Sequence, residues 1–201
     1  MSTLVVENIS KSFGGVKAVQ GVSFEVGAGQ ILALIGPNGA GKSTCFNMLN
    51  GQLRADTGSV RFDGADITRE TPSQIWRRGV GRTFQVAQTF GSMTVRENVQ
   101  MVLHSLHGRL RSLWSPLTYG FRQEADAVLE AVGMLSQADR ACCVLAYGDV
   151  KRLELAMALA NKPKLLLMDE PTAGMAPKER NELMSLTASL VKSRGLSVLF
   201  T

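Results

Sequence analysis

The stretch Gly36-Pro37-Asn38-Gly39-Ala40-Gly41-Lys42-Ser43-Thr44 decides the fold of this chain. It follows the apolar run Ile31–Ile35, which is typical of a central parallel strand buried on both faces. It opens a predicted helix over Lys42–Asn50, with Gly51 as its stop. The pattern G-x-x-x-x-G-K-[ST] between a strand and a helix is typical of a phosphate-binding loop.

Each part of this loop has an expected chemical role. Its glycines let successive backbone N–H groups turn toward a phosphate, and the helix N-terminus adds partial positive charge. Lys42 is expected to neutralise the β- and γ-phosphates of a nucleotide, and the Ser43 hydroxyl to ligate Mg²⁺. The alternative is a glycine-rich loop that binds nothing.

A second pattern places two carboxylates after an apolar strand. Leu165-Leu166-Leu167-Met168 is followed by Asp169 and Glu170, at the strand end where open α/β sheets bind ligands. Asp169 suits a contact to the water shell of Mg²⁺, and Glu170 suits a general base that polarises an attacking water. Alone, such a pair usually marks only a strand end, but beside the phosphate loop it indicates nucleotide hydrolysis.

Strands and helices alternate along most of the chain, which predicts a mainly parallel α/β sheet. Between them, residues 94–133 are predicted to be helical, with a capping box at Thr94–Glu97 and an irregular link over 108–120. The remaining predicted strands are Thr3–Ile9, Val16–Val26, Ser59–Phe62 and Ser197–Phe200, and the remaining helices begin at Pro72, Phe121, Val150 and Pro177.

Composition places the chain among ordinary globular domains. Its 201 residues are 45% hydrophobic and 19% charged, and no apolar run is long enough to cross a bilayer. The net charge of +5 suits polyphosphate, nucleic acid or an anionic membrane, but ordinary solubility explains it equally well. The three cysteines, Cys45, Cys142 and Cys143, are expected to be buried or half-buried rather than metal ligands.

These residues, together with Arg82-Thr83-Phe84-Gln85 and Leu145-Ala146-Tyr147-Gly148-Asp149, resemble the nucleotide-binding subunit of an ABC transporter. The resemblance covers essentially the whole chain, and its subgroup is branched-chain amino acid uptake. It implies a P-loop NTPase with a RecA-like core over residues 1–86 and 161–201. An inserted helical subdomain, residues 87–160, would carry the signature loop of the family, here Leu145–Asp149. The core and the subdomain would together form a single ABC ATPase cassette.

The resemblance also implies roles for particular residues. Phe13 matches the aromatic residue that stacks on adenine, although a strand phenylalanine can equally belong to the core. Gln85 matches the glutamine that senses Mg²⁺ and the membrane partner. Tyr147 and Gly148 match the signature loop, which faces the γ-phosphate held by a second subunit. The implied cofactors are ATP and Mg²⁺, with Lys42, Gln85 and Glu170 catalytic and Ser43, Gln85 and Asp169 near the metal.

Several positions depart from the family pattern. Ala146 stands where the family places a serine, which removes a hydroxyl donor worth about 1–3 kcal/mol. Val150 replaces a polar residue of the signature, and Ala176 stands where many members of the family place an aspartate. The sequence stops at Thr201, where the family continues to a switch histidine, so the C-terminal part of the cassette is expected to be missing. His104 and His107 lie in the helical insert and are expected to be surface or packing residues.

The predicted function is the ATP-binding and hydrolysing subunit of an importer for branched-chain or related small amino acids. Its expected partners are a second ATPase subunit, identical or not, two membrane permeases and, indirectly, an extracytoplasmic solute-binding protein, with no nucleic acid. We expect it to be peripheral, on the cytoplasmic face of the inner membrane. The alternatives are a hydrolysis-deficient nucleotide-binding fragment and a non-transport ABC ATPase. A small-molecule P-loop kinase would leave Gln85 and the signature unexplained.

Overall fold

The computed structural model describes residues 2–84, 88–108 and 120–201. The chain divides into two compact units, which are described separately. Unit 1 comprises residues 1–82, 164–170 and 188–201, and unit 2 comprises residues 83–163 and 171–187. Helix α6 (Pro177–Arg194) contributes residues to both. The expected boundaries of a core and a helical subdomain, at 86/87 and 160/161, stay a prediction.

Unit 1 contains an antiparallel sheet that the sequence patterns did not predict as a separate layer. Its strands lie in the order β2-β1-β4-β5. Gly14 and Gly15, both at positive φ, form the tight turn that joins the first two strands, where Phe13 pairs with Val16. The strands are β1 (Ser2–Phe13), β2 (Val16–Gly27), β4 (Thr57–Phe62) and β5 (Ala65–Asp66).

The second sheet of unit 1 carries the strands that precede the two predicted phosphate-binding motifs. Its order is β3-β8-β7-β6, and β8 pairs in parallel with both β3 and β7. The predicted parallel α/β arrangement is therefore confirmed. The strands are β3 (Ile31–Ala33), β6 (Val80–Thr83), β7 (Leu165–Met168) and β8 (Ser197–Phe200).

Strands β7 and β3 differ in how deeply their residues are buried. All four residues of β7 are buried, as predicted for a strand covered on both faces. The same prediction is wrong for Ile31–Ile35: the strand ends at Ala33, Ile31 is 40% exposed and Ile35 is 90% exposed. The reason is position, because among the described strands β3 lies at the edge of its sheet and pairs only with β8.

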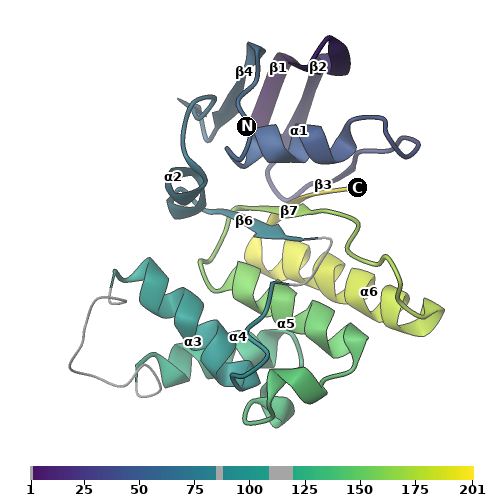
Figure 1. Cartoon of the computed structure of the whole chain (residues 1–201). Coiled ribbons are helices and arrows are strands. Elements are labelled where there is room, and N and C mark those ends of the chain that lie inside the picture. The colour runs from purple at the N-terminus through teal and green to yellow at the C-terminus, as the bar shows by residue number, and fades with distance from the viewer. Residues whose placement is uncertain (1, 85–87, 109–119) are drawn as a thin grey trace. The chain divides into compact units, whose positions relative to one another are not determined.

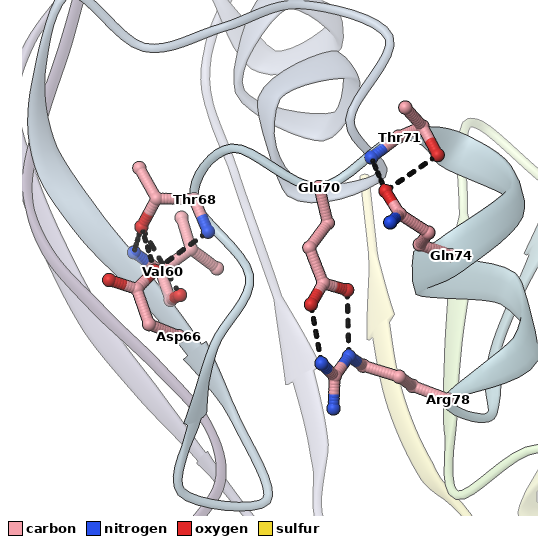
Figure 2. A network of polar contacts seen from close by, with 7 residues as sticks. All are labelled: Val60, Asp66, Thr68, Glu70, Thr71, Gln74 and Arg78. Atoms are coloured by element: carbon pink, nitrogen blue, oxygen red, sulfur yellow. Dashed lines mark hydrogen bonds and ion pairs between the residues drawn. The ribbon is translucent and has the colours of Figure 1, made fainter.

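Two helices of unit 1 begin where the sequence predicted. Helix α1 (Lys42–Leu49) follows the glycine-rich loop and buries Phe46 and Leu49 in the core of the unit. Helix α2 (Pro72–Arg77) starts at a capping box in which the N–H and the hydroxyl of Thr71 both donate to Oε1 of Gln74, at 2.8 Å. Figure 2 shows this cap beside the two-pronged ion pair of Glu70 with Arg78, whose closest atoms are 2.5 Å apart.

Unit 2 is mainly helical, and α3, α4 and α5 pack against one another (Figure 1). The capping box at Thr94–Glu97 is confirmed. Arg96 of α3, 10% exposed, forms ion pairs with Asp126, at 2.6 Å, and with Asp139. The elements are α3 (Val95–Leu106), α4 (Arg122–Ala131), the 3₁₀ turns η3 (Leu135–Gln137) and η4 (Cys142–Val144), and α5 (Tyr147–Leu159).

Three minor expectations are also decided in this unit. His104 is a buried packing residue and His107 lies exposed at the surface, and both rings contact Phe121 at centroid distances of 5.0 and 4.5 Å. Cys142 is buried, but the expectation for Cys143 is wrong because it lies exposed on the short turn η4. Most of the predicted link over 108–120 lies outside the described residues. In the part of the chain that the structure describes, no helix has the length and apolarity needed to span a membrane.

Candidate functional site

The glycine-rich loop passes from β3 into α1 with its glycines in conformations that other residues rarely adopt. Gly39 and Gly41 have φ values of 83° and 84°. A Cβ on Gly41 would lie 2.1 Å from the backbone oxygen of Ala18 on β2, whereas a Cβ on Gly39 would meet no atom within 4 Å. Gly41 is the N-cap of α1 and supplies no side-chain hydrogen bond, so the N–H groups of the first turn lack a capping side chain and could bind an anion instead.

This geometry makes Gly41→Ala strongly destabilising. The new methyl group must displace backbone, so we expect a loss of about 3 kcal/mol or more in the free energy of unfolding. Gly39→Ala is the matched control, because it shares the positive φ without the collision and should lose only about 1–2 kcal/mol. Urea unfolding of both variants measures the difference, and equal losses would contradict the predicted collision.

Lys42 is the first residue of α1, and its side chain folds back onto the loop. Its Nζ donates hydrogen bonds to the carbonyl oxygens of Gly36 and Pro37, at 2.7 and 2.9 Å. The ammonium group is therefore held by the loop backbone rather than extended into solvent. A cation beside an uncapped helix N-terminus favours a polyanionic ligand such as a phosphate chain.

A cavity of about 310 Å³ borders this loop. Gly39, Ala40, Gly41 and Lys42 line one part of it, and most of the rest is lined by residues of β2 and by the two residues that follow β3. Cys45 of α1 also lines it, and burial raises the pKa of its thiol to about 11, so this cysteine stays protonated at neutral pH. A small polar group can thus enter beside the loop without meeting a thiolate.

Phe13, the predicted adenine-stacking residue, lies at the end of β1. Its side chain is 47% exposed, which excludes the alternative that it is a core strand residue. Lys11 lies with its Nζ 5.7 Å from the ring centroid. Phe13 is not among the residues that line the 310 Å³ cavity. Its role as an adenine platform stays a prediction that its exposed ring favours.

Asp169 and Glu170 follow β7, and Thr201, which directly follows the neighbouring strand β8, contacts both. The Thr201 hydroxyl donates to Asp169 Oδ1 at 3.0 Å and accepts from the Glu170 N–H at 2.8 Å. Glu170 has φ 45°, which costs a residue with a Cβ about 1–3 kcal/mol and recurs at functional sites. Sequence reasoning missed Thr201, although the parallel pairing of the two strands could have placed it there.

Arg82 is a second residue that sequence reasoning did not assign to the site. Its guanidinium lies 3.4 Å from Asp169 Oδ2, and the two side chains are 10% and 7% exposed. It also donates to Gln52 Oε1 at 3.1 Å. Burial lowers the pKa of Arg82, and attraction to Asp169 opposes that shift. The pair fixes the Asp169 carboxylate, since each of its oxygens already has a partner.

The oxygen donors present fit Mg²⁺, which prefers carboxylate and hydroxyl oxygens and retains several waters. Because Thr201 and Arg82 engage both Asp169 oxygens, Asp169 suits a contact to metal-bound water better than a direct bond. Ser43, in the first turn of α1, would supply the direct ligand. When bound, the ion would offset phosphate charge.

The predicted signature residues belong to unit 2. Helix α5 begins at Tyr147, so the prediction of a helix starting at Val150 is wrong by one turn, and Tyr147 and Gly148 lie in its first turn. Ala146 is the N-cap and provides no side-chain bond, which leaves the N–H groups of that turn without the cap a serine would supply. The Tyr147 hydroxyl donates to the Ala173 carbonyl at 3.1 Å.

The structure brings only some of the predicted residues together. Because β3 and β7 run parallel on either side of β8, the loops that follow them leave the same end of the sheet. The phosphate loop and the acidic pair therefore both lie at the carboxyl ends of the parallel strands in unit 1. Tyr147 and Gly148 form a separate group in unit 2, and Gln85 lies outside the described residues.

Comparison with known proteins agrees with this arrangement. The family profile described as ABC transporter matches residues 19–173. The branched-chain amino acid transport ATP-binding proteins LivG of Salmonella typhimurium and BraF of Pseudomonas aeruginosa are 40% and 38% identical, each over 98% of this chain and 80% of their own length.

Solved structures give the same result for the fold. The ADP conformation of an ATP-binding cassette of an ABC transporter superposes with a TM-score of 0.90 at 36% identity, over all of this chain and 80% of the other. The expected P-loop ATPase fold is confirmed, and this fold implies that the chain binds a nucleotide. With a family profile over most of its length and relatives of this similarity, the chain belongs to the ABC transporter family.

Proposed function

We propose that this chain is the ATP-binding and hydrolysing subunit of an importer for branched-chain or related small amino acids. The observation that carries the proposal is that two motifs lie at the same end of the parallel sheet: the Lys42 loop follows β3, and the Asp169–Glu170 pair follows β7. The names of the relatives support the substrate class. In this assignment, residues 1–86 and 161–201 form the catalytic core and residues 87–160 the helical subdomain.

The proposed chemistry uses the residues of this chain in sequence. The loop N–H groups and Lys42 bind the phosphates, with Phe13 against adenine. Glu170 accepts a proton from the attacking water, and Ser43, Gln85 and Asp169 would hold Mg²⁺ and its water shell. Arg82 and Thr201 keep the Asp169 carboxylate oriented.

The position of Tyr147 and Gly148 in the first turn of α5 supports the proposed assembly. Gly148 and the N-terminus of α5 would face the γ-phosphate held by a second ATPase subunit, so two chains would enclose two ATP molecules. The conformational change that accompanies ATP binding and hydrolysis would reach two membrane permeases through the Gln85 region, on the cytoplasmic face of the membrane. A solute-binding protein would deliver the substrate.

One observation favours a second candidate, a nucleotide-binding chain that hydrolyses ATP poorly. Ala146 offers no hydroxyl at the N-cap of α5, where a serine could contact the γ-phosphate of the partner site. In that case binding through Lys42 and Ser43 would survive while turnover stayed low. Steady-state phosphate release from the purified chain with Mg²⁺ and ATP distinguishes the two candidates.

Disruption of the gene in its native cell tests the transport assignment. We expect uptake of labelled leucine at micromolar concentration to fall at least tenfold, because an importer without ATP hydrolysis cannot concentrate its substrate. A plasmid copy should restore uptake, and a Lys42→Ala copy should not. Uptake of a labelled sugar is the control. Undiminished uptake of leucine, isoleucine and valine would contradict the assigned substrate class.

A further inference from the structure

Helix α5 carries an ion pair that is almost completely buried. Lys151 Nζ lies 3.1 Å from Glu154 Oε2, one turn apart on the helix, and the two side chains are 3% and 5% exposed. Removing two charges from water is costly, and such a pair often contributes less stability than apolar residues of the same volume. Its presence therefore points to a geometric role rather than to stability.

Both members of the pair also bind the backbone of one residue. Glu154 Oε1 accepts a hydrogen bond from the Phe84 N–H at 3.1 Å, and Lys151 Nζ donates to the Phe84 carbonyl at 2.9 Å. Phe84 follows the last residue of β6, where the hydrogen bonding of the strand ends. The carbonyl that Lys151 holds belongs to the peptide bond that joins Phe84 to Gln85.

The same helix turn reaches the signature residues. Lys151 Nζ lies 5.8 Å from the centroid of the Tyr147 ring, and Tyr147 and Gly148 form the first turn of α5. The ammonium group of Lys151 thus lies near both the signature tyrosine and the carbonyl of Phe84, the residue before Gln85. Both contacts are made by one side chain of α5, so the first turn of this helix and the Phe84 carbonyl share a partner.

We propose that Lys151 and Glu154 are positioning residues that fix the backbone entering Gln85 to the helix of the signature loop. They keep the two segments in register during ATP hydrolysis without contacting ATP themselves. The inference rests on the proposed function, because it assigns Gln85 and the signature loop to one catalytic cycle. The contacts themselves are independent of that assignment.

Steady-state ATP hydrolysis by the purified chain tests the catalytic part. Lys151→Met should lower kcat at least fivefold and leave KM for ATP within twofold of the parent, since the substrate contacts remain. Lys151→Arg, which keeps the charge and the donors, should recover at least half of the parent kcat. Arg152→Met is the matched control: it removes the exposed pair with Glu182, at 2.5 Å on the same helix, and should keep kcat within twofold.

Amide hydrogen exchange tests the contact without using activity. In Glu154→Leu and Lys151→Met, the Phe84 amide should exchange at least tenfold faster than in the parent, while amides of β7 keep their protection. Unchanged exchange at Phe84, or equal losses of kcat in Lys151→Met and Arg152→Met, would overturn the inference. An inactive parent chain would contradict the proposed function, and exchange at Phe84 would then decide the inference alone.

Discussion

Glu170→Gln is expected to lower the rate of Mg²⁺-dependent ATP hydrolysis by about 100-fold to 10,000-fold. The substitution preserves the size of the side chain and removes the carboxylate that accepts the proton of the attacking water. The backbone should remain in place, because the Thr201 hydroxyl binds the N–H of residue 170 and not its side chain. Affinity for ATP should therefore change by less than about threefold.

Phosphate release and equilibrium binding of a fluorescent ATP analogue separate these two effects. Glu70→Gln is the matched control, since it makes the same chemical change at the surface ion pair with Arg78 (Figure 2). That variant should hydrolyse ATP at the parent rate. Turnover of Glu170→Gln at the parent level would show that Glu170 is not the general base.

Lys42→Ala is expected to weaken ATP binding by about 10-fold to 100-fold, because a charge-assisted hydrogen bond contributes about 1.5–3 kcal/mol. Two causes add in this variant. The phosphates lose a cation, and the loop loses the two hydrogen bonds from Nζ to the carbonyl oxygens of Gly36 and Pro37. Hydrolysis should fall below detection as a consequence.

Calorimetric titration with a non-hydrolysable ATP analogue measures this affinity. Lys164→Ala is the control, since it removes the same charge from an ion pair with Asp63, at 2.5 Å on the surface of unit 1. Its affinity should stay within twofold of the parent. An unchanged affinity in Lys42→Ala, or an equal loss in both variants, would contradict a direct contact between Lys42 and the phosphates.

Local signals explain why much of this structure could be predicted from the sequence. The capping box at Thr94 and the proline at position 177 placed the starts of α3 and α6 correctly. In the glycine-rich loop, the spacing of the glycines, the lysine and the serine is specific to phosphate-binding loops. Its position between β3 and α1 depends on neighbouring residues alone, so a single sequence contains enough information.

Contacts between distant residues explain what could not be predicted. The exposure of Ile35 depends on which strands flank β3, and no feature of the run Ile31–Ile35 encodes that. Arg82 lies 87 positions from Asp169 in the sequence, and Phe84 lies 70 from Glu154. Such contacts follow from the order of strands and the packing of helices, which periodicity does not specify.

The strand order also has a consequence for how the protein is made. The Lys42 loop and the Asp169–Glu170 pair flank β8, the last described strand to be synthesised. During translation, a nascent chain can form the antiparallel sheet early, but the hydrolytic edge stays incomplete until β8 is inserted between its neighbours. Parallel pairing between segments so far apart is slow. We therefore expect an emerging chain to lack an assembled hydrolytic site and to expose β3 as an unpaired, aggregation-prone strand until β8 is made.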